Sequence, residues 1–153
     1  MRTSGQSRQL SQIEPFAFSR QVLSARKCLL NLVPCDNDFE YAFARFLENA
    51  KDVVAFCKLP LQFGFSIEYT DNNANLRYYY PDFVVKTERD EMWLVETKGQ
   101  ESLEVRYKDM AAHLWCQNAT ALTGQQWRYV KVPQKEYERL QPVKFYDLLP
   151  FVD

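Results

Sequence analysis

The sequence predicts an α/β domain in which a mixed central sheet is flanked by helices. Residues 36–50 repeat apolar side chains at helical spacing, which predicts an amphipathic helix. Residues 91–98 are apolar at both odd and even positions, which is typical of a strand covered on both faces. A second helical pattern separates this strand from another β-rich run. The predicted core order is therefore helix, three strands, helix, strand, and layer rules place the helices on the faces of the sheet.

The elements follow from local signals along the chain. The polar residues 1–15 are interpreted as a flexible tail or linker, and residues 16–153 as one domain with its core at about 36–132. A first helix is expected near 17–30, and Asp36 is expected to cap the helix over 36–50. The predicted strands are 53–58, 63–70, 76–86, 91–98 and 127–132. The remaining predicted helices are 102–118, with Leu103, Tyr107, Met110 and Leu114 inward, and the short segments 134–140 and 145–149.

Composition limits the classes of function. The 153 residues are 46% hydrophobic and 15% aromatic, enough for a core, and no apolar run reaches the length of a membrane span. The N-terminus lacks the apolar core of a signal peptide, and the four cysteines show no CxxC spacing. We therefore expect a cytoplasmic protein with reduced thiols and no membrane partner. The aromatic residues, including Tyr78, Tyr79 and Tyr80, are expected mainly in the core.

Two absences narrow the chemistry further. The single histidine, His113, argues against a Ser-His-Asp triad, an HNH-type nuclease and a His-ligated zinc site. No GxxxxGK[ST] loop is present, so no ATP site is expected in this chain. The net charge of −1 predicts weak nucleic-acid binding by the domain alone, because basic excess is the usual footprint of such binding.

The most informative segment is a predicted hairpin around Arg89. If the two strands pair symmetrically about Arg89, paired positions sum to 178 and Asp82 lies opposite Glu96. Opposite side chains on one face have Cβ atoms roughly 4.5–5.5 Å apart, and Lys98 shares the face of Glu96. The repulsion between the two carboxylates, roughly 3–4 kcal/mol at an effective dielectric of 20, requires a proton, a lysine or a bound cation to relieve it. A purely structural Asp–Lys–Glu cluster is the alternative.

The spacing of these residues carries a resemblance to a known family. Pro81-Asp82, thirteen further residues and Glu96-Thr97-Lys98 resemble the PD-(D/E)xK nuclease signature. The flanking runs Tyr-Tyr-Pro-Asp-Phe-Val-Val and Val-Glu-Thr-Lys-Gly, with the segment 107–116, are similar to the C-terminal endonuclease region of type III restriction enzymes and of related helicase-nucleases. The resemblance extends over about residues 36–132 and implies the restriction-endonuclease-like fold.

The resemblance also implies roles for particular residues. Asp82, Glu96 and the backbone carbonyl of Thr97 would hold Mg²⁺, for which Mn²⁺ would substitute, and Lys98 would orient the attacking water. Glu40 would assist the metal from the first core helix, although an acid in a first turn also stabilises a helix by itself. Two further residues are weaker candidates for binding substrate; these are Lys108 and Gln100.

Partners are implied by the resemblance alone. They are DNA, a superfamily-two helicase motor in the same polypeptide or in a separate chain, and a modification methyltransferase subunit. Two other functions stay open at this point. One is a nuclease-like scaffold that docks a motor or binds DNA without cutting, and the other is a nuclease that acts on RNA.

Overall fold

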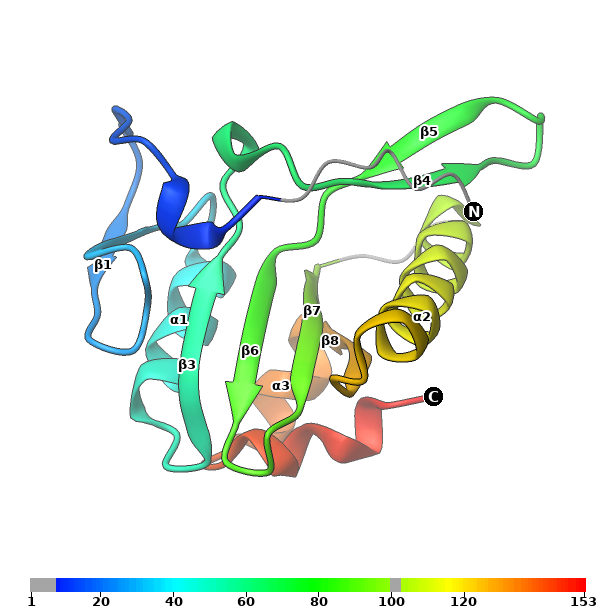
Figure 1. Ribbon diagram of the computed structural model, residues 1–153. Coiled ribbons are helices and arrows are strands. Elements are labelled where there is room, and N and C mark those ends of the chain that lie inside the picture. Colours follow the sequence, from blue (N-terminus) through cyan, green and yellow to red (C-terminus); the bar gives the residue numbers. More distant parts are fainter. Residues whose placement is uncertain (1–7, 100–102) are drawn as a thin grey trace.

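A four-stranded mixed sheet forms the centre of the molecule (Figure 1). The computed structural model describes residues 8–99 and 103–153. The strands are β1 (Val22–Ser24), β2 (Leu32–Pro34), β3 (Val53–Lys58), β4 (Ile67–Thr70), β5 (Leu76–Tyr79), β6 (Phe83–Thr87), β7 (Met92–Lys98) and β8 (Trp127–Pro133). The helices are α1 (Asp38–Asn49), α2 (Leu103–Thr123) and α3 (Gln134–Leu140), with 3-10 turns η1 (Leu10–Gln12), η2 (Leu61–Phe63) and η3 (Phe145–Phe151).

The central sheet has the order β3-β6-β7-β8, and only β7 and β8 are parallel. β7 therefore lies inside the sheet with a neighbour on each side, as its two apolar faces predict. The parallel pair is joined by α2, which is the crossover that parallel strands require. The predicted fold class, a mixed sheet flanked by helices in the core order αβββαβ, is confirmed.

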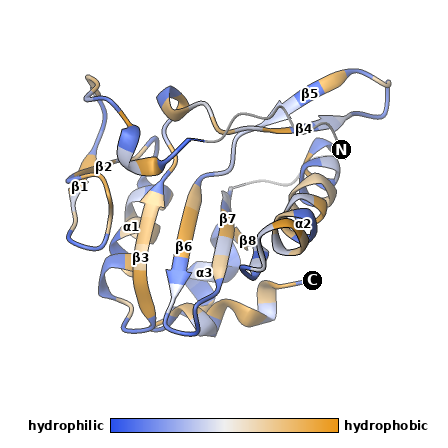
Figure 2. Ribbon diagram, in the orientation of Figure 1, coloured by the Kyte–Doolittle hydropathy of each residue, from blue (hydrophilic) through white to orange (hydrophobic). Residues whose placement is uncertain are grey.

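Each face of the sheet is covered by its own hydrophobic core. On one face, α1, α3 and η3 pack on odd-numbered strand residues such as Phe83, Trp93 and Val95. On the other face, α2 and the β4–β5 hairpin pack on Val84, Leu94 and neighbouring residues. Figure 2 shows the hydrophobic colouring concentrated along β3, β6 and β7, with hydrophilic turns at their ends. The sheet is therefore buried on both sides, and its strand ends are where polar groups gather.

Three predicted elements are wrong in detail. The segment 17–30 forms no helix; it contains β1, which pairs with β2 in a separate two-stranded sheet. The strand predicted over 76–86 is two strands, because Pro81 cannot donate a backbone hydrogen bond and β5 ends before it. The strand predicted from residue 63 begins at Ile67, since η2 occupies Leu61–Phe63.

The buried face of α2 also differs from the prediction. Met110 and Leu114 are 63% and 55% exposed, whereas Val105, Ala112 and Cys116 are buried. Small side chains let the helix approach the aromatic surface formed by Tyr129 and its neighbours, which leaves the larger ones outside. Tyr107 packs against this core, as predicted.

The remaining expectations concern the termini and the aromatic residues. Arg8 donates to the Phe63 carbonyl, and the assignment of residues 1–15 as a linker stays a prediction. Tyr79 is buried, as expected, but Tyr78 and Tyr80 are 50% and 47% exposed, so a core position is wrong for these two. Alternation along a strand places neighbours of a buried residue on the opposite face. Within the described ranges, no helix is long and apolar enough to cross a bilayer.

Candidate active site

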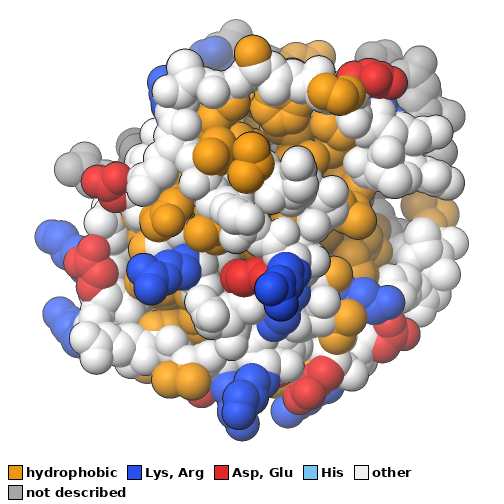
Figure 3. All heavy atoms as spheres, turned by 90° about the vertical axis from the view of Figure 1, so that its left-hand side faces the viewer, with side chains coloured by type: hydrophobic (Ala, Val, Ile, Leu, Met, Phe, Trp, Pro, Cys, Tyr) orange, Lys and Arg blue, Asp and Glu red, His pale blue; other side chains and the backbone are white. Residues whose placement is uncertain are grey.

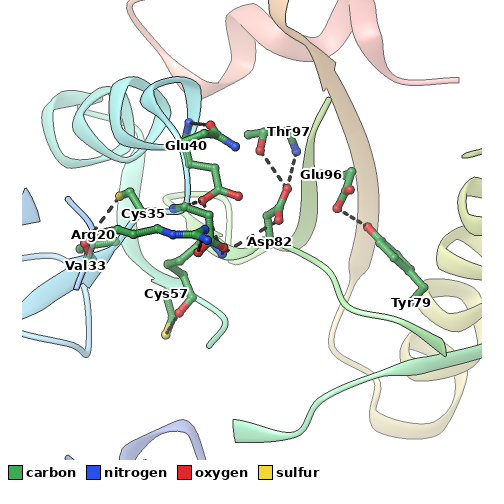
Figure 4. A network of polar contacts seen from close by, with 12 residues as sticks. Arg20, Val33, Cys35, Glu40, Cys57, Tyr79, Asp82, Glu96 and Thr97 are labelled. Atoms are coloured by element: carbon green, nitrogen blue, oxygen red, sulfur yellow. Dashed lines mark hydrogen bonds and ion pairs between the residues drawn. The ribbon is translucent and has the colours of Figure 1, made fainter. Parts of the chain in front are cut away.

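The hairpin formed by β6 and β7 has the register that the sequence predicts. Every recorded pair, from Phe83 opposite Val95 to Lys86 opposite Met92, sums to 178. The recorded pairing ends at Phe83 and Val95; continued beyond it, the same register would set Asp82 opposite Glu96 and Pro81 opposite Thr97. Asp82 thus lies at the end of the sheet, one residue before β6, rather than in the middle of an apolar strand. Figure 4 shows the Asp82 side chain between those of Glu40 and Glu96.

The Asp82 carboxylate is held by Thr97. Its Oδ2 accepts hydrogen bonds from the Thr97 amide at 2.9 Å and from the Thr97 hydroxyl at 2.8 Å. In an antiparallel ladder, the amide and carbonyl of one residue point to the same neighbouring strand. In the continued register the residue opposite Thr97 would be Pro81, which has no N–H. The Thr97 carbonyl points to the same side as its amide, toward Asp82, and Pro81 could not donate to it. This direction fits the backbone ligand that the resemblance implies.

Glu96 is held from the other side of the sheet. Its Oε2 accepts a hydrogen bond of 2.8 Å from the hydroxyl of Tyr79, a buried residue at the end of β5. Burial raises the pKa of Glu96 well above its usual value, and the nearby charge of Asp82 raises it further. The bond from Tyr79 and two lysines lower this pKa to a smaller extent. Asp82 therefore lies close enough to Glu96 for its charge to oppose the ionisation of Glu96.

The lysines that act on Glu96 come from two elements. Lys98 is the last residue of β7 and is half-buried, and Lys108 lies half-buried on α2. Their charges both lower the pKa of Glu96, the effect of Lys98 being the larger. The structure thus brings both predicted lysines toward the same carboxylate, from the strand end and from the helix that crosses over it.

Glu40 reaches the site from the first turn of α1. The Asn37 side chain caps the helix by accepting from the Glu40 amide at 2.8 Å, one residue later than the predicted cap Asp36. Glu40 Oε2 in turn accepts a bond of 2.6 Å from the Asp36 amide. Burial raises the pKa of Glu40, and the charge of Asp82 raises it too, while that of Lys58 lowers it. Glu40 therefore belongs both to the helix cap and to the group of acids around Asp82.

The residue that sequence reasoning missed is Lys58, the last residue of β3. Its Nζ lies 3.8 Å from Asp36 Oδ2, 3.8 Å from Glu40 Oε2 and 4.0 Å from Asp82 Oδ1. Its side chain is only 6% exposed. The available signal was a lysine that ends an otherwise apolar strand directly before Leu59-Pro60, because buried lysines are rare unless they are paired.

The donor set fits a hard cation in one respect and not in another. Across residues 8–99 and 103–153, no group of three or more His, Cys, Asp or Glu side chains is arranged to hold a metal ion. Mg²⁺, however, is commonly bound by one or two carboxylates and keeps water or substrate oxygens as its other ligands. Asp82, Glu96 and the Thr97 carbonyl would supply such a partial set if they act as ligands. The predicted substrate-binding residue Gln100 lies outside the described residues.

The face of the molecule that carries β1 has a mixed charge distribution (Figure 3). Figure 3 shows Lys and Arg side chains interspersed with Asp and Glu on this face, and its described residues form no continuous basic band there. A basic band would provide the salt-dependent attraction that dominates non-specific DNA binding. This face is therefore consistent with the weak binding that the net charge predicts.

The chain matches the model of one protein family. Residues 26–135 match the model of a family described as "Endonuclease domain", and this match covers most of the chain, including Glu40, Lys58, Asp82, Glu96 and Lys98. The chain belongs to this family of endonuclease domains, and its fold is of the restriction-endonuclease-like kind. Nuclease function follows from this membership. Neither the curated proteins nor the solved structures contain a significant match to the chain.

Proposed function

We propose that this domain is a Mg²⁺-dependent endonuclease of the PD-(D/E)xK kind that hydrolyses phosphodiester bonds in DNA. One observation carries the proposal: Asp82 lies directly before the paired part of β6, its carboxylate accepts from the Thr97 amide, and its charge acts on the neighbouring Glu96. Family membership supports nuclease chemistry in general. Mg²⁺, with Mn²⁺ as a substitute, and DNA are the specific additions made here.

The residues divide the work by their positions. Asp82 and Glu96 would hold the cation with the Thr97 carbonyl, and Glu40 would support it from α1. A bound divalent cation would polarise the scissile phosphate and lower the pKa of a water molecule. Lys98, at the strand end beside Glu96, would orient that water and offset negative charge that develops on the phosphate. Lys108 would contact a phosphate from α2.

A plasmid-nicking assay with Mg²⁺ or Mn²⁺ tests the proposal. Wild-type protein should convert supercoiled plasmid to nicked or linear forms, and Asp82→Ala should not. The matched control is Asp71→Ala, which removes an acid bonded to Arg77 in the β4–β5 turn and should cut like wild type. Absence of metal-dependent cutting by a folded wild-type protein would defeat the proposal and favour the scaffold that binds without cutting. Parallel reactions on RNA would decide between the two nucleic acids.

The wider setting is proposed from the resemblance of residues 36–132 to type III restriction enzymes. In that setting a superfamily-two helicase motor, in the same polypeptide or as a separate chain, supplies ATP-driven translocation. A modification methyltransferase subunit supplies target recognition. Coupling would appear as a dependence on ATP: cutting by the assembled proteins should require ATP, whereas nicking by the isolated domain should not.

A further inference from the structure

We propose that Lys58 is a positioning residue that joins Glu40 to Asp82 and takes the place of the metal's charge when no metal is bound; its catalytic consequence rests on the proposed function. The evidence is the placement of one buried ammonium among carboxylates from three separate segments. Glu40 comes from α1, Asp36 from the turn before it, and Asp82 from the position directly before β6. Lys58 itself ends β3, the strand next to β6.

The distances describe a shared counter-ion rather than a single salt bridge. All three N–O separations lie between 3.8 and 4.0 Å, which is longer than the 2.7–3.2 Å of a direct hydrogen bond. No one carboxylate holds the ammonium, so its charge is divided among the three acids. Removing it would leave the buried Glu40 and the partly buried Asp82 near each other without an ammonium between them, and a buried charge that loses its partner is strongly unfavourable.

Burial separates the role of Lys58 from that of Lys98. The Lys58 side chain is 6% exposed and also lies over the Phe83 ring, with Nζ 5.8 Å from the ring centroid. A side chain enclosed in this way has little surface with which to touch a nucleic acid. Lys98, half-buried at the strand end, is the lysine placed to meet a substrate. Lys58 therefore acts through Glu40 and Asp82.

The positive charge of Lys58 predicts a specific effect on the stability gained from metal binding. Lys58 and a bound divalent cation both neutralise Asp82, so each should reduce the benefit of the other. A protein without Lys58 should be less stable in chelator, yet gain more stability from metal than the wild type does. A lysine that serves only packing would affect stability equally with and without metal.

The test is thermal unfolding in chelator and then in excess Mg²⁺, repeated with Ca²⁺. Lys58→Met should lower Tm in chelator by on the order of 5 °C or more, and its metal-induced rise in Tm should exceed that of the wild type. Lys58→Arg should restore both values toward wild type. The control is Lys27→Met, which removes a half-buried lysine that donates to the Ala50 carbonyl at 2.6 Å. It should lower Tm and leave the metal-induced rise at the wild-type value.

A second measurement covers the case in which Lys58→Met does not fold. The double variant Lys58→Met with Glu40→Gln removes opposite charges together, so it should lose less Tm in chelator than the sum of the single losses, or fold where Lys58→Met does not. Equal metal-induced rises in Lys58→Met and wild type, or additive losses in the double variant, would overturn the inference. The comparison of the double variant with the two single variants in chelator requires neither metal nor cleavage. Non-additive Tm losses without plasmid nicking would reject the proposed function alone. Additive losses with plasmid nicking would reject the role of Lys58 alone.

Discussion

Both ends of the central sheet bury acidic side chains, and the two ends use them differently. At the hairpin end, Asp52 is 2% exposed, and its two oxygens accept from the Phe145 amide at 2.8 Å and from the Tyr146 amide at 3.0 Å. At the opposite end, the charge of Asp82 acts on Glu96 at the end of β7 and on Glu40 in the first turn of α1. The first acid joins η3 to the sheet, whereas the second group contains two acids, Glu40 and Glu96, whose ionisation is opposed by the charge of Asp82.

The comparison separates a structural acid from a site acid by the identity of its neighbours. Asp52 meets N–H dipoles, and each of its two oxygens accepts a hydrogen bond from a backbone amide, which stabilises the buried carboxylate. Glu40 and Glu96 meet burial and a neighbouring negative charge, both of which raise their pKa. A bound cation would relieve the second arrangement and not the first. The predictions below test this difference, beginning with the largest expected effect.

The largest effect is expected at the strand end beside Glu96. Lys98→Ala should lower the single-turnover cleavage rate by about 10²–10³-fold, because one preorganised charge in the transition state is lost. DNA affinity measured in Ca²⁺ should change little. The control is Lys86→Ala, which removes an exposed lysine paired with Asp90 near the opposite end of β6 and should cut at the wild-type rate. A saturated Lys98→Ala protein that cuts as fast as wild type would remove Lys98 from the mechanism.

The next effect concerns stability at the hairpin end. Asp52→Ala leaves two amides of η3 without their acceptor, and an unsatisfied buried donor costs about 1–3 kcal/mol. The variant should lose about 2–4 kcal/mol of unfolding free energy, a fall in Tm of roughly 5–15 °C at about 2–4 °C per kcal/mol. Scanning calorimetry measures this loss. The metal-induced rise in Tm should persist; its loss would mean that the two ends of the sheet are not independent.

The register of the β6–β7 hairpin could be predicted from the sequence because it depends on local chemistry. The turn, the alternation and the charged positions of residues 78–99 all agree on symmetry about Arg89, and the structure has that register. The central position of β7 follows equally from its two apolar faces. In such segments each local preference supports the tertiary arrangement.

The misses arise where tertiary packing decides. Met110 and Leu114 are larger and more apolar than Ala112, yet the helix turns Ala112 inward because the facing surface is already filled by aromatic rings. Lys58 is far from Asp82 and Glu40 in sequence, and only the pairing of β3 with β6 brings them together. Tyr78 and Tyr80 are exposed because Tyr79, between them, points inward. The aromatic content of the chain does not predict which of the three tyrosines is buried.

A third prediction returns to the site end and concerns metal. Mg²⁺ should increase the unfolding free energy of the wild type by about 1.4 kcal/mol at tenfold excess over its dissociation constant, and should therefore raise its Tm. Asp82→Asn should lose this response because its amide is a poor substitute for the carboxylate. In chelator the variant should be as stable as wild type within about 1 kcal/mol, since the lost attraction to Lys58 is offset by relief of repulsion from Glu40 and Glu96. An equal metal response in both proteins would exclude Asp82 as a ligand.

The smallest expected effect is a slope of stability against pH in chelator. Because the folded-state pKa of Glu40 lies above its usual value of 4.5, the folded protein binds more protons than the unfolded chain between these two values. Stability should therefore fall as pH rises through this window, and Glu96 contributes in the same direction. Glu40→Gln has no proton to lose and should show a shallower slope in urea titrations at successive pH values. Asp71→Asn is the control of opposite sign: hydrogen bonds lower the pKa of Asp71 from 3.8 to about 2, so its effect should appear only on acidification below that window. An unchanged slope in Glu40→Gln would show that the burial of Glu40 beside Asp82 does not oppose its charge, and the contrast between the two ends of the sheet would then rest on Glu96 alone.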